Sequence, residues 1–242
     1  MSRFERALQV ASSQLAEEFR DDLLGLLFAG SSAYGAPMHN SDVDLYVLIR
    51  PSWRQRRNRL IEGVVVEMFI NPVHQIHREL DDGPNATVDM FARGRIVSDP
   101  AGVVTELVER AQRIADQPPQ APDETQLFFI RLRPSDFLHD AEDLVDHDPT
   151  AARMLLGTAL QAALEAHWHI QGRRAPSPKR RLAALRSEAP ALAQDLELVM
   201  DPERDLADRV GRLRRLCEQI LAPVGGLLLE GQTKPELLPE DE

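Results

Sequence analysis

Two adjoining stretches decide the fold: LLFAGSSAYG at residues 26–35 and NSDVDLYVLI at residues 40–49. Each contains an apolar run with the length and the Val, Leu and Ile content of a buried strand. The first run ends in a Gly-Ser pair, and the second opens with Asp-Val-Asp. Residues two apart in a strand project from the same face. We therefore expect Asp42 and Asp44 to point together, beside the Gly-Ser turn.

This pairing of acids and glycine predicts binding of a metal and a phosphate. Two neighbouring carboxylates repel each other unless a cation lies between them. Mg²⁺, or Mn²⁺ in its place, suits oxygen ligands and completes its shell with substrate phosphates and water. Gly30 lets the backbone approach a phosphate closely, and Ser31, Ser32 and the N–H groups of the following turn can bind phosphate oxygens. The pattern predicts a site for a nucleoside triphosphate. The alternative is a solvated strand end with capping acids.

A third acid, Glu67, interrupts the apolar run VVVEMFI at residues 64–70. A charge within such a run is rarely buried unpaired, so Glu67 faces a cleft or a metal, or it pairs with an arginine. Three acids on two adjacent strands could hold two metals ~3.5–4 Å apart, which would clamp the attacking and leaving oxygens of a phosphoryl displacement. The chemistry expected of this constellation is nucleotidyl transfer.

The rest of the chain predicts an α+β catalytic half followed by a helical half. An amphipathic helix is expected over 4–19 and strands over 23–29, 43–49 and 64–70. Three prolines at residues 118–122 predict a connector. Helices are expected over 124–147, 150–171, 178–198 and 203–221. The predicted organisation is a catalytic domain at 1–116, a linker at 117–123, a helical substrate-binding domain at 124–230 and a disordered acidic tail at 231–242.

Composition narrows the class of protein. The 242 residues carry 28 Lys and Arg against 39 Asp and Glu, a net charge of −11, which argues against a nucleic-acid-coating protein. One cysteine, Cys217, allows no intrachain disulfide. No apolar run approaches the ~18 residues of a membrane helix, and the N-terminus lacks the apolar core of a signal peptide. We expect a soluble, cytoplasmic protein; its oligomeric state is open.

The sequence Ala-Gly-Ser at residues 29–31, followed after ten residues by Asp-Val-Asp-Leu at residues 42–45, resembles the signature of the polymerase-β-like nucleotidyltransferase superfamily. The similarity extends over residues 20–115. The motif is most similar to the bacterial branch of aminoglycoside and minimal nucleotidyltransferases, which implies a small mixed sheet flanked by helices. The resemblance implies that Gly30 and Ser31 bind the triphosphate, that Asp42 and Asp44 bind metals, and that Glu67 is the third carboxylate and helps to deprotonate the acceptor. One position departs from the family pattern, because Tyr34 stands where minimal nucleotidyltransferases often have arginine.

The helical half resembles, more loosely, the substrate-binding domain of kanamycin- and streptomycin-type nucleotidyltransferases, over residues 167–182. This similarity makes Lys179 a candidate contact for the triphosphate; a solvated surface position is the alternative. Six basic residues and no acid lie between Arg173 and Arg186, which predicts an anion-binding island. A second basic cluster, formed by Arg54, Arg56, Arg57 and Arg59, is expected to be a solvated excursion between two strands; a contact with the triphosphate is the alternative.

The expected function is Mg²⁺-dependent transfer of a nucleoside monophosphate to a hydroxyl of a small acceptor, with release of pyrophosphate. The acidic composition suits a cationic acceptor such as an aminoglycoside, held in a cleft between the two halves. Two alternatives stay open: a nucleotidyltransferase that modifies a protein or an RNA, and a non-catalytic nucleotide-binding module. RNA is disfavoured by the acidity and by the lack of interleaved aromatic residues.

Overall fold

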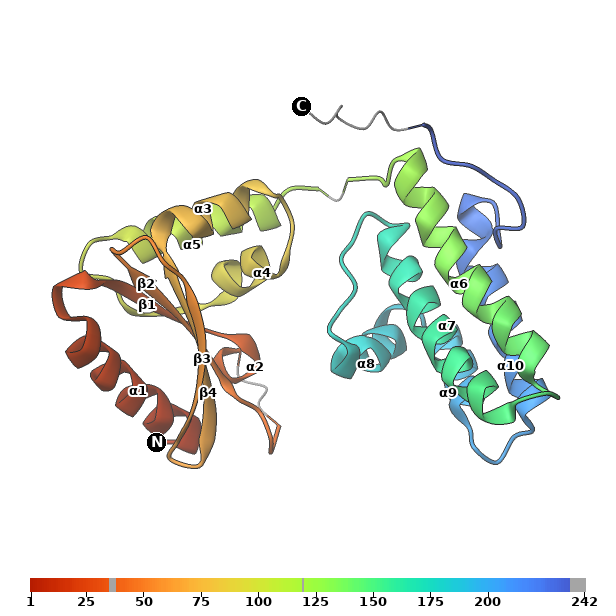
Figure 1. The fold of residues 1–242 in the computed structure, drawn as a ribbon, viewed down its shortest axis with the longest axis horizontal. Coiled ribbons are helices and arrows are strands. Elements are labelled where there is room, and N and C mark those ends of the chain that lie inside the picture. Colours follow the sequence, from red (N-terminus) through yellow and green to blue (C-terminus); the bar gives the residue numbers. More distant parts are fainter. Residues whose placement is uncertain (35–37, 119, 236–242) are drawn as a thin grey trace, which may run out of the picture. The chain divides into compact units, whose positions relative to one another are not determined.

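A computed structural model gives the structure of the chain and describes residues 1–34, 38–118 and 120–235. The chain divides into two compact units, Met1–Pro118 and Pro119–Glu242, and the division falls within the predicted proline-rich connector (Figure 1). Gly35 of the motif, Pro119 of the connector and residues 236–242 of the tail lie outside the described residues.

The first unit contains every strand that the structure describes. Its elements are α1 (Arg3–Phe19), η1 (Arg20–Asp22), β1 (Leu23–Ala29), α2 (Gly30–Ala33), β2 (Val43–Ile49), β3 (Gln55–Ile61), β4 (Val64–Pro72), α3 (Val73–Asp81), α4 (Ala86–Arg93), β5 (Arg95–Ser98) and α5 (Val103–Ala115). A capping box of Ser2 and Glu5 starts α1. The three predicted strands are confirmed as β1, β2 and β4.

Within the described residues, the strands form one five-stranded mixed sheet in the order β3-β4-β2-β1-β5. Strands β2 and β4 are parallel, and the other neighbouring pairs are antiparallel. The parallel register places Asp44 directly beside Glu67. The predicted α+β fold with a small mixed sheet is confirmed, and this register brings the predicted acids together.

Helices cover both faces of the sheet, and strand alternation decides which face carries the acids. On β2 and β4, Val43, Leu45, Val66 and Met68 pack in the core beneath α1. Tyr46 and Leu48 point the other way, into a second core that includes residues of α3, α4 and α5 (Figure 1). Asp44 and Glu67 share this second face by the period of two but remain partly exposed.

The predicted solvated excursion at residues 54–59 is wrong, because Gln55–Ile61 forms the edge strand β3. A two-residue turn joins β3 to β4, and Glu62 and Gly63 both have positive φ there, 52° and 72°. Two such residues form the type of turn whose twist matches a tight hairpin. Most of the side chains of β3 are exposed, so the strand lacks the apolar alternation that would predict it.

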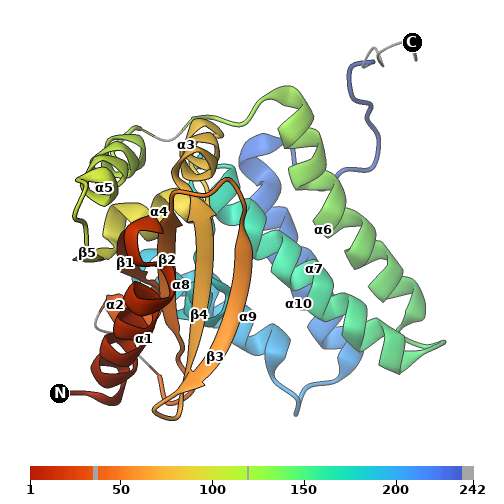
Figure 2. The ribbon, with the colours of Figure 1, turned by 60° about the vertical axis from the view of Figure 1, so that its left-hand side comes forward.

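The second unit is helical, as expected. It comprises α6 (Glu124–Leu144), α7 (Pro149–His169), α8 (Pro178–Glu188), α9 (Pro190–Met200), α10 (Leu206–Leu221) and η2 (Ala222–Val224). Helices α6, α7 and α10 lie side by side (Figure 2). The single helix expected over 178–198 is wrong. It is divided at Pro190, which has no N–H to donate and holds Ala189 in a non-helical conformation, with φ −146° and ψ 67°.

Two smaller expectations concern the tail and membranes. Residues 231–235 of the predicted disordered tail have neither helix nor strand, and Lys234 pairs with Glu124 of α6 at 2.6 Å. In the described part of the chain, each helix is too short or too polar to cross a membrane.

Candidate active site

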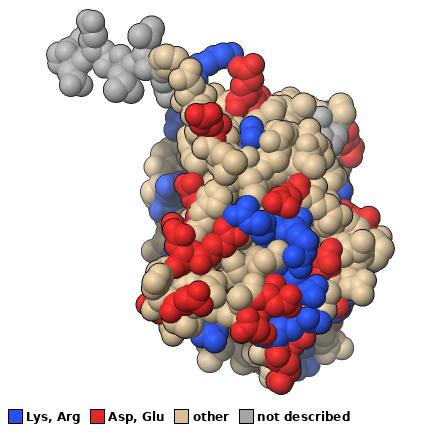
Figure 3. Space-filling view, turned by 90° about the vertical axis from the view of Figure 1, so that its right-hand side faces the viewer, with Lys and Arg blue, Asp and Glu red and all other residues tan. Residues whose placement is uncertain are grey.

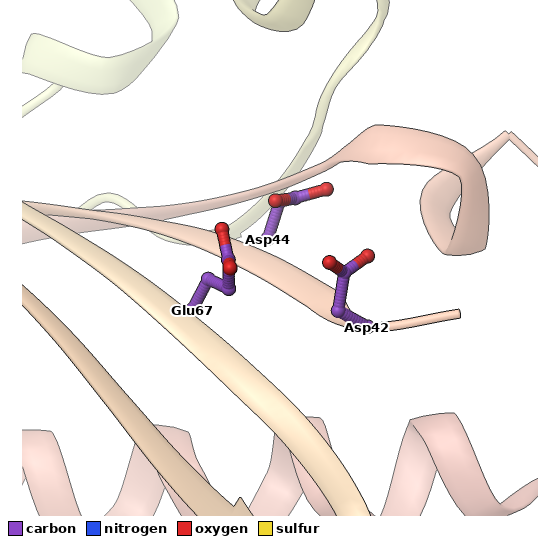
Figure 4. Close-up of side chains that lie close together, drawn as sticks. All are labelled: Asp42, Asp44 and Glu67. Carbon is purple, nitrogen blue, oxygen red and sulfur yellow. The ribbon is translucent and has the colours of Figure 1, made fainter. Parts of the chain in front are cut away.

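The three predicted acids converge on one side of the sheet (Figure 4). Asp44 lies in β2 beside Glu67 of β4, and Asp42 lies two residues before Asp44, just ahead of the strand. Each offers an oxygen within 4.8 Å of the oxygens of the other two. Parallel pairing of β2 and β4 thus converts a sequence separation of more than twenty residues into one carboxylate cluster.

Gly30 closes the cluster on the side of β1. It follows the strand at φ +74°, and a β-carbon added there would lie 1.8 Å from Oδ2 of Asp44. Any other residue would meet both the left-handed backbone conformation and the carboxylate. The glycine of the motif is therefore required for the position of Asp44, besides the phosphate role that the sequence predicts.

Hydroxyl groups tie the turn after Gly30 to the start of β2. Ser32 donates a hydrogen bond from its hydroxyl to the backbone carbonyl of Asp42. The hydroxyls of Ser31 and Ser41 are 3.3 Å apart, and Ser41 accepts the N–H of Met38 at 2.7 Å. Ser32 thus fixes the backbone that carries Asp42. The predicted triphosphate-binding roles of Ser31 and Ser32 stay predictions.

Glu67 has two partners on β3. Nη2 of Arg56 lies 2.6 Å from Oε2 of Glu67, and Nδ2 of Asn58 donates to Oε1 at 3.3 Å. The arginine pairing left open by the sequence is therefore formed, and Glu67 belongs to the carboxylate cluster as well. The sequence did not identify Arg56 and Asn58 as the partners of Glu67. The Glu62-Gly63 turn is a signal that could have done so, because pairing outward from that turn places Asn58 opposite Glu67.

An aromatic row leads from Arg56 into the core. The Arg56 guanidinium carbon lies 4.8 Å from the Phe69 ring centroid, and Phe69 stacks on Tyr46 at 4.9 Å. Tyr46 in turn meets the edge of Phe91 at 4.9 Å. Burial raises the pKa of Tyr46 to about 12, so its phenol is neutral at physiological pH. The row anchors Phe69, the ring on which Arg56 rests.

A second arginine lies beside the Gly30 turn. The Arg93 guanidinium carbon, at the end of α4, lies 4.2 Å from the ring centroid of Tyr34. Burial is the main cause that raises the pKa of Tyr34. Of the nearby charges, Asp44 also raises this pKa and Arg93 lowers it. A cation is thus present next to Tyr34, the position where the sequence differs from the pattern of the minimal nucleotidyltransferases that it resembles. Sequence reasoning missed it because α4 and the turn are far apart along the chain.

Lys179 belongs to the second unit, where it is exposed near the start of α8. Its predicted role at the triphosphate stays a prediction. The basic island around it is partly neutralised, because at least three of its six members bind carboxylates of their own unit: Arg173 with Glu188, Arg181 with Glu165, and Arg186 with Glu197. Figure 3 likewise shows acidic and basic side chains next to one another on the face that it displays.

The donor set of the cluster fits a divalent cation. The three side chains are carboxylates that each place an oxygen within 4.8 Å of the others, and Glu67 forms an ion pair with Arg56. Carboxylate oxygens without sulfur or imidazole are the ligands that Mg²⁺ and Mn²⁺ prefer. The residues present therefore suit such a metal, with Asp44 on β2, Asp42 just ahead of that strand and Glu67 on β4.

Three comparisons with known proteins were informative to different degrees. No family model matches the chain, and no curated protein matches it. Among solved structures, the chain is similar to a nucleotidyltransferase-like protein from Exiguobacterium sibiricum 255-15, with a TM-score of 0.50 and 15% identity. The match covers 92% of this chain and 75% of the other. At this identity the similarity concerns the fold, in which the carboxylate cluster is embedded.

Proposed function

We propose that the protein is a divalent-metal-dependent nucleotidyltransferase. It would transfer a nucleoside monophosphate from a nucleoside triphosphate to a hydroxyl group of a small acceptor and release pyrophosphate. The observation that carries the proposal is the convergence of Asp42, Asp44 and Glu67 beside the Gly30 turn, with ligand oxygens within 4.8 Å of one another. The likeness of the fold to a nucleotidyltransferase-like protein supports it.

In this reaction the carboxylates have distinct tasks. Asp42, Asp44 and Glu67 would hold the metal, preferably Mg²⁺, with Mn²⁺ as a substitute, and Glu67 would have a second task. Such an ion, when bound, stabilises the charge that develops on the phosphoryl oxygens. Glu67 would accept the proton of the acceptor hydroxyl, whose oxygen forms a bond to the α-phosphorus as the bond to the pyrophosphate oxygen breaks.

The triphosphate would lie against the Gly30 turn. Gly30 brings the backbone close, Ser31 offers a partly exposed hydroxyl, and Ser32 holds the turn to Asp42. Arg93, stacked on Tyr34, offers a guanidinium, which forms strong charge-assisted hydrogen bonds with phosphates. Lys179 of the second unit is a further candidate phosphate contact, on the strength of the sequence resemblance.

We favour a small cationic acceptor, such as an aminoglycoside. The net charge of −11 attracts cations and repels the phosphates of a nucleic acid. The three ion pairs within the basic island of the second unit also lower the charge available for an RNA backbone.

The proposal is tested by measuring pyrophosphate release with each of the four nucleoside triphosphates, Mg²⁺ or Mn²⁺, and a panel of aminoglycosides. Mass spectrometry of the acceptor then identifies the added nucleoside monophosphate. We expect release to disappear when Asp42→Asn and Asp44→Asn are combined. The matched control combines Asp21→Asn and Asp22→Asn, at the opposite end of β1. Release that persists undiminished in the Asp42 and Asp44 variant would contradict the proposal.

A further inference from the structure

Both carboxylate oxygens of Glu67 already have partners from the neighbouring strand. Oε2 is 2.6 Å from Nη2 of Arg56, and Oε1 is 3.3 Å from Nδ2 of Asn58. The Glu67 side chain is only 18% exposed, so few other directions of approach remain. A metal that binds Glu67 therefore meets an oxygen that already accepts a hydrogen bond, from the guanidinium at Oε2 or from the amide at Oε1.

A guanidinium and a divalent ion compete for such an oxygen. A Mg²⁺ ion binds carboxylate oxygens at about 2.0–2.1 Å, and two cations on the same oxygen repel each other. Asp42, Asp44 and Glu67 each contribute one oxygen to the cluster, and only Glu67 has the ion pair with Arg56 described above. Arg56 should therefore weaken metal binding by Glu67 more than metal binding by the two aspartates.

Arg56 can leave Glu67 without leaving the site. Its side chain is 64% exposed, and its strand is at the edge of the sheet. Its guanidinium carbon also lies 4.8 Å from the Phe69 ring centroid, and this stacking does not require the carboxylate. The Phe69 ring, which Tyr46 holds in place, remains a stacking partner for the guanidinium after its displacement from the carboxylate.

We infer that Arg56 and a divalent cation are alternative partners of Glu67. In the metal-free protein, Arg56 holds the Glu67 carboxylate in place. Binding of the metal at Glu67 displaces the guanidinium, so Arg56 is a positioning residue that weakens the affinity for that metal. This inference rests on the proposed function, because it takes the cluster to be a metal site.

The test is titration of the full chain with Mn²⁺, followed by electron paramagnetic resonance of the free ion. Arg56→Gln should bind Mn²⁺ about two- to fivefold more tightly than the wild type, the range expected for the loss of a competing exposed ion pair. Arg57→Gln is the matched control. Arg57 is the next residue of the same strand, but it pairs with Glu18 of α1 at 2.8 Å, on the other face. Its removal lowers the net charge equally and should leave Mn²⁺ affinity unchanged.

A second pair of variants isolates Glu67. In a Glu67→Gln background, Arg56→Gln should no longer change Mn²⁺ affinity, because the shared partner has lost its charge. The inference is contradicted if Arg56→Gln weakens or does not alter Mn²⁺ binding, if Arg57→Gln has the same effect, or if the effect persists without Glu67. Absence of Mn²⁺ binding in the wild type and in Arg56→Gln would instead contradict the metal site itself, and the inference with it.

Discussion

The α-carbon of Gly30 directly faces the carboxylate of Asp44: a β-carbon there would lie 1.8 Å from Oδ2. Gly30→Ala must therefore displace the carboxylate or the turn. It also places alanine at φ +74°, which costs about 1–3 kcal/mol of folding free energy. We expect both lower stability to denaturant and loss of Mn²⁺ binding.

Gly63→Ala separates these two effects. Gly63 has φ +72°, but a β-carbon there would have no atom within 4 Å apart from those of its two chain neighbours. This variant should lose about 1–3 kcal/mol of stability from backbone strain and bind Mn²⁺ like the wild type. Equal Mn²⁺ affinity in Gly30→Ala and Gly63→Ala would show that the contact with Asp44 has no role in metal binding.

Ser32→Ala tests how the turn holds Asp42. The variant loses the hydrogen bond to the Asp42 carbonyl, which contributes about 0.5–1.5 kcal/mol. We expect the Mn²⁺ affinity to fall severalfold, because the Asp42 backbone is less restrained. Ser12→Ala removes a comparable bond to the Leu8 carbonyl within α1 and should leave Mn²⁺ affinity unchanged. If both variants behave alike, Ser32 has no special part in positioning Asp42.

Arg93 and Arg95 form a matched pair for the triphosphate. Arg93 stacks on Tyr34 beside the Gly30 turn, whereas Arg95 stacks on Phe28, whose side chain belongs to the core under α1. With Mn²⁺ and tripolyphosphate as a base-independent probe, calorimetry should show Arg93→Gln binding about tenfold more weakly, as for the loss of ~1.4 kcal/mol. Arg95→Gln should bind as the wild type does. Equal losses would indicate general electrostatics and contradict a direct contact with Arg93.

The fold also contains a pH-sensitive element at the start of α5. Partial burial by itself raises the pKa of Asp99, but hydrogen bonds from the Thr105 hydroxyl and from the N–H groups of Val104 and Thr105 outweigh it, so the net pKa lies below 3.8. The bonds measure 2.6, 3.0 and 2.8 Å, respectively. A lowered carboxyl pKa contributes stability that is present above the unfolded-state pKa and is lost as pH falls through the folded-state pKa.

Asp99→Asn should therefore lower the free energy of unfolding at pH 7 by about 1 kcal/mol and reduce its dependence on pH below 4. Urea unfolding between pH 3 and pH 7 measures both effects. Asp21→Asn, at an exposed aspartate, is the control. An unchanged pH dependence in Asp99→Asn would refute the assigned role.

Much of the site could be predicted from the sequence because its determinants are local. The spacing of Asp42 and Asp44 places both on one face of a strand. The apolar run around Glu67 identifies a second buried strand. Gly30 and Ser31 mark the turn between the first strand and the acids. These features depend on residues one to three positions apart, which a linear pattern records.

What could not be predicted depends on tertiary contacts. Strand β3 lies at the edge of the sheet, and most of its side chains are exposed and polar. It therefore lacks the apolar pattern from which a strand is predicted. The partners of Arg56 and Arg93 come from other elements. In the helical unit, the carboxylates that bind Arg173, Arg181 and Arg186 are 11 to 16 residues away, which made the basic island look unneutralised.

The most direct test of the central claim is binding of Mn²⁺ together with α,β-methylene analogues of the four nucleoside triphosphates, which cannot transfer a nucleotide. We predict that the wild type binds Mn²⁺, that at least one analogue increases the Mn²⁺ affinity, and that combining Asp42→Asn with Asp44→Asn abolishes both effects. Mn²⁺ and analogue binding that survives the double substitution unchanged would contradict the account.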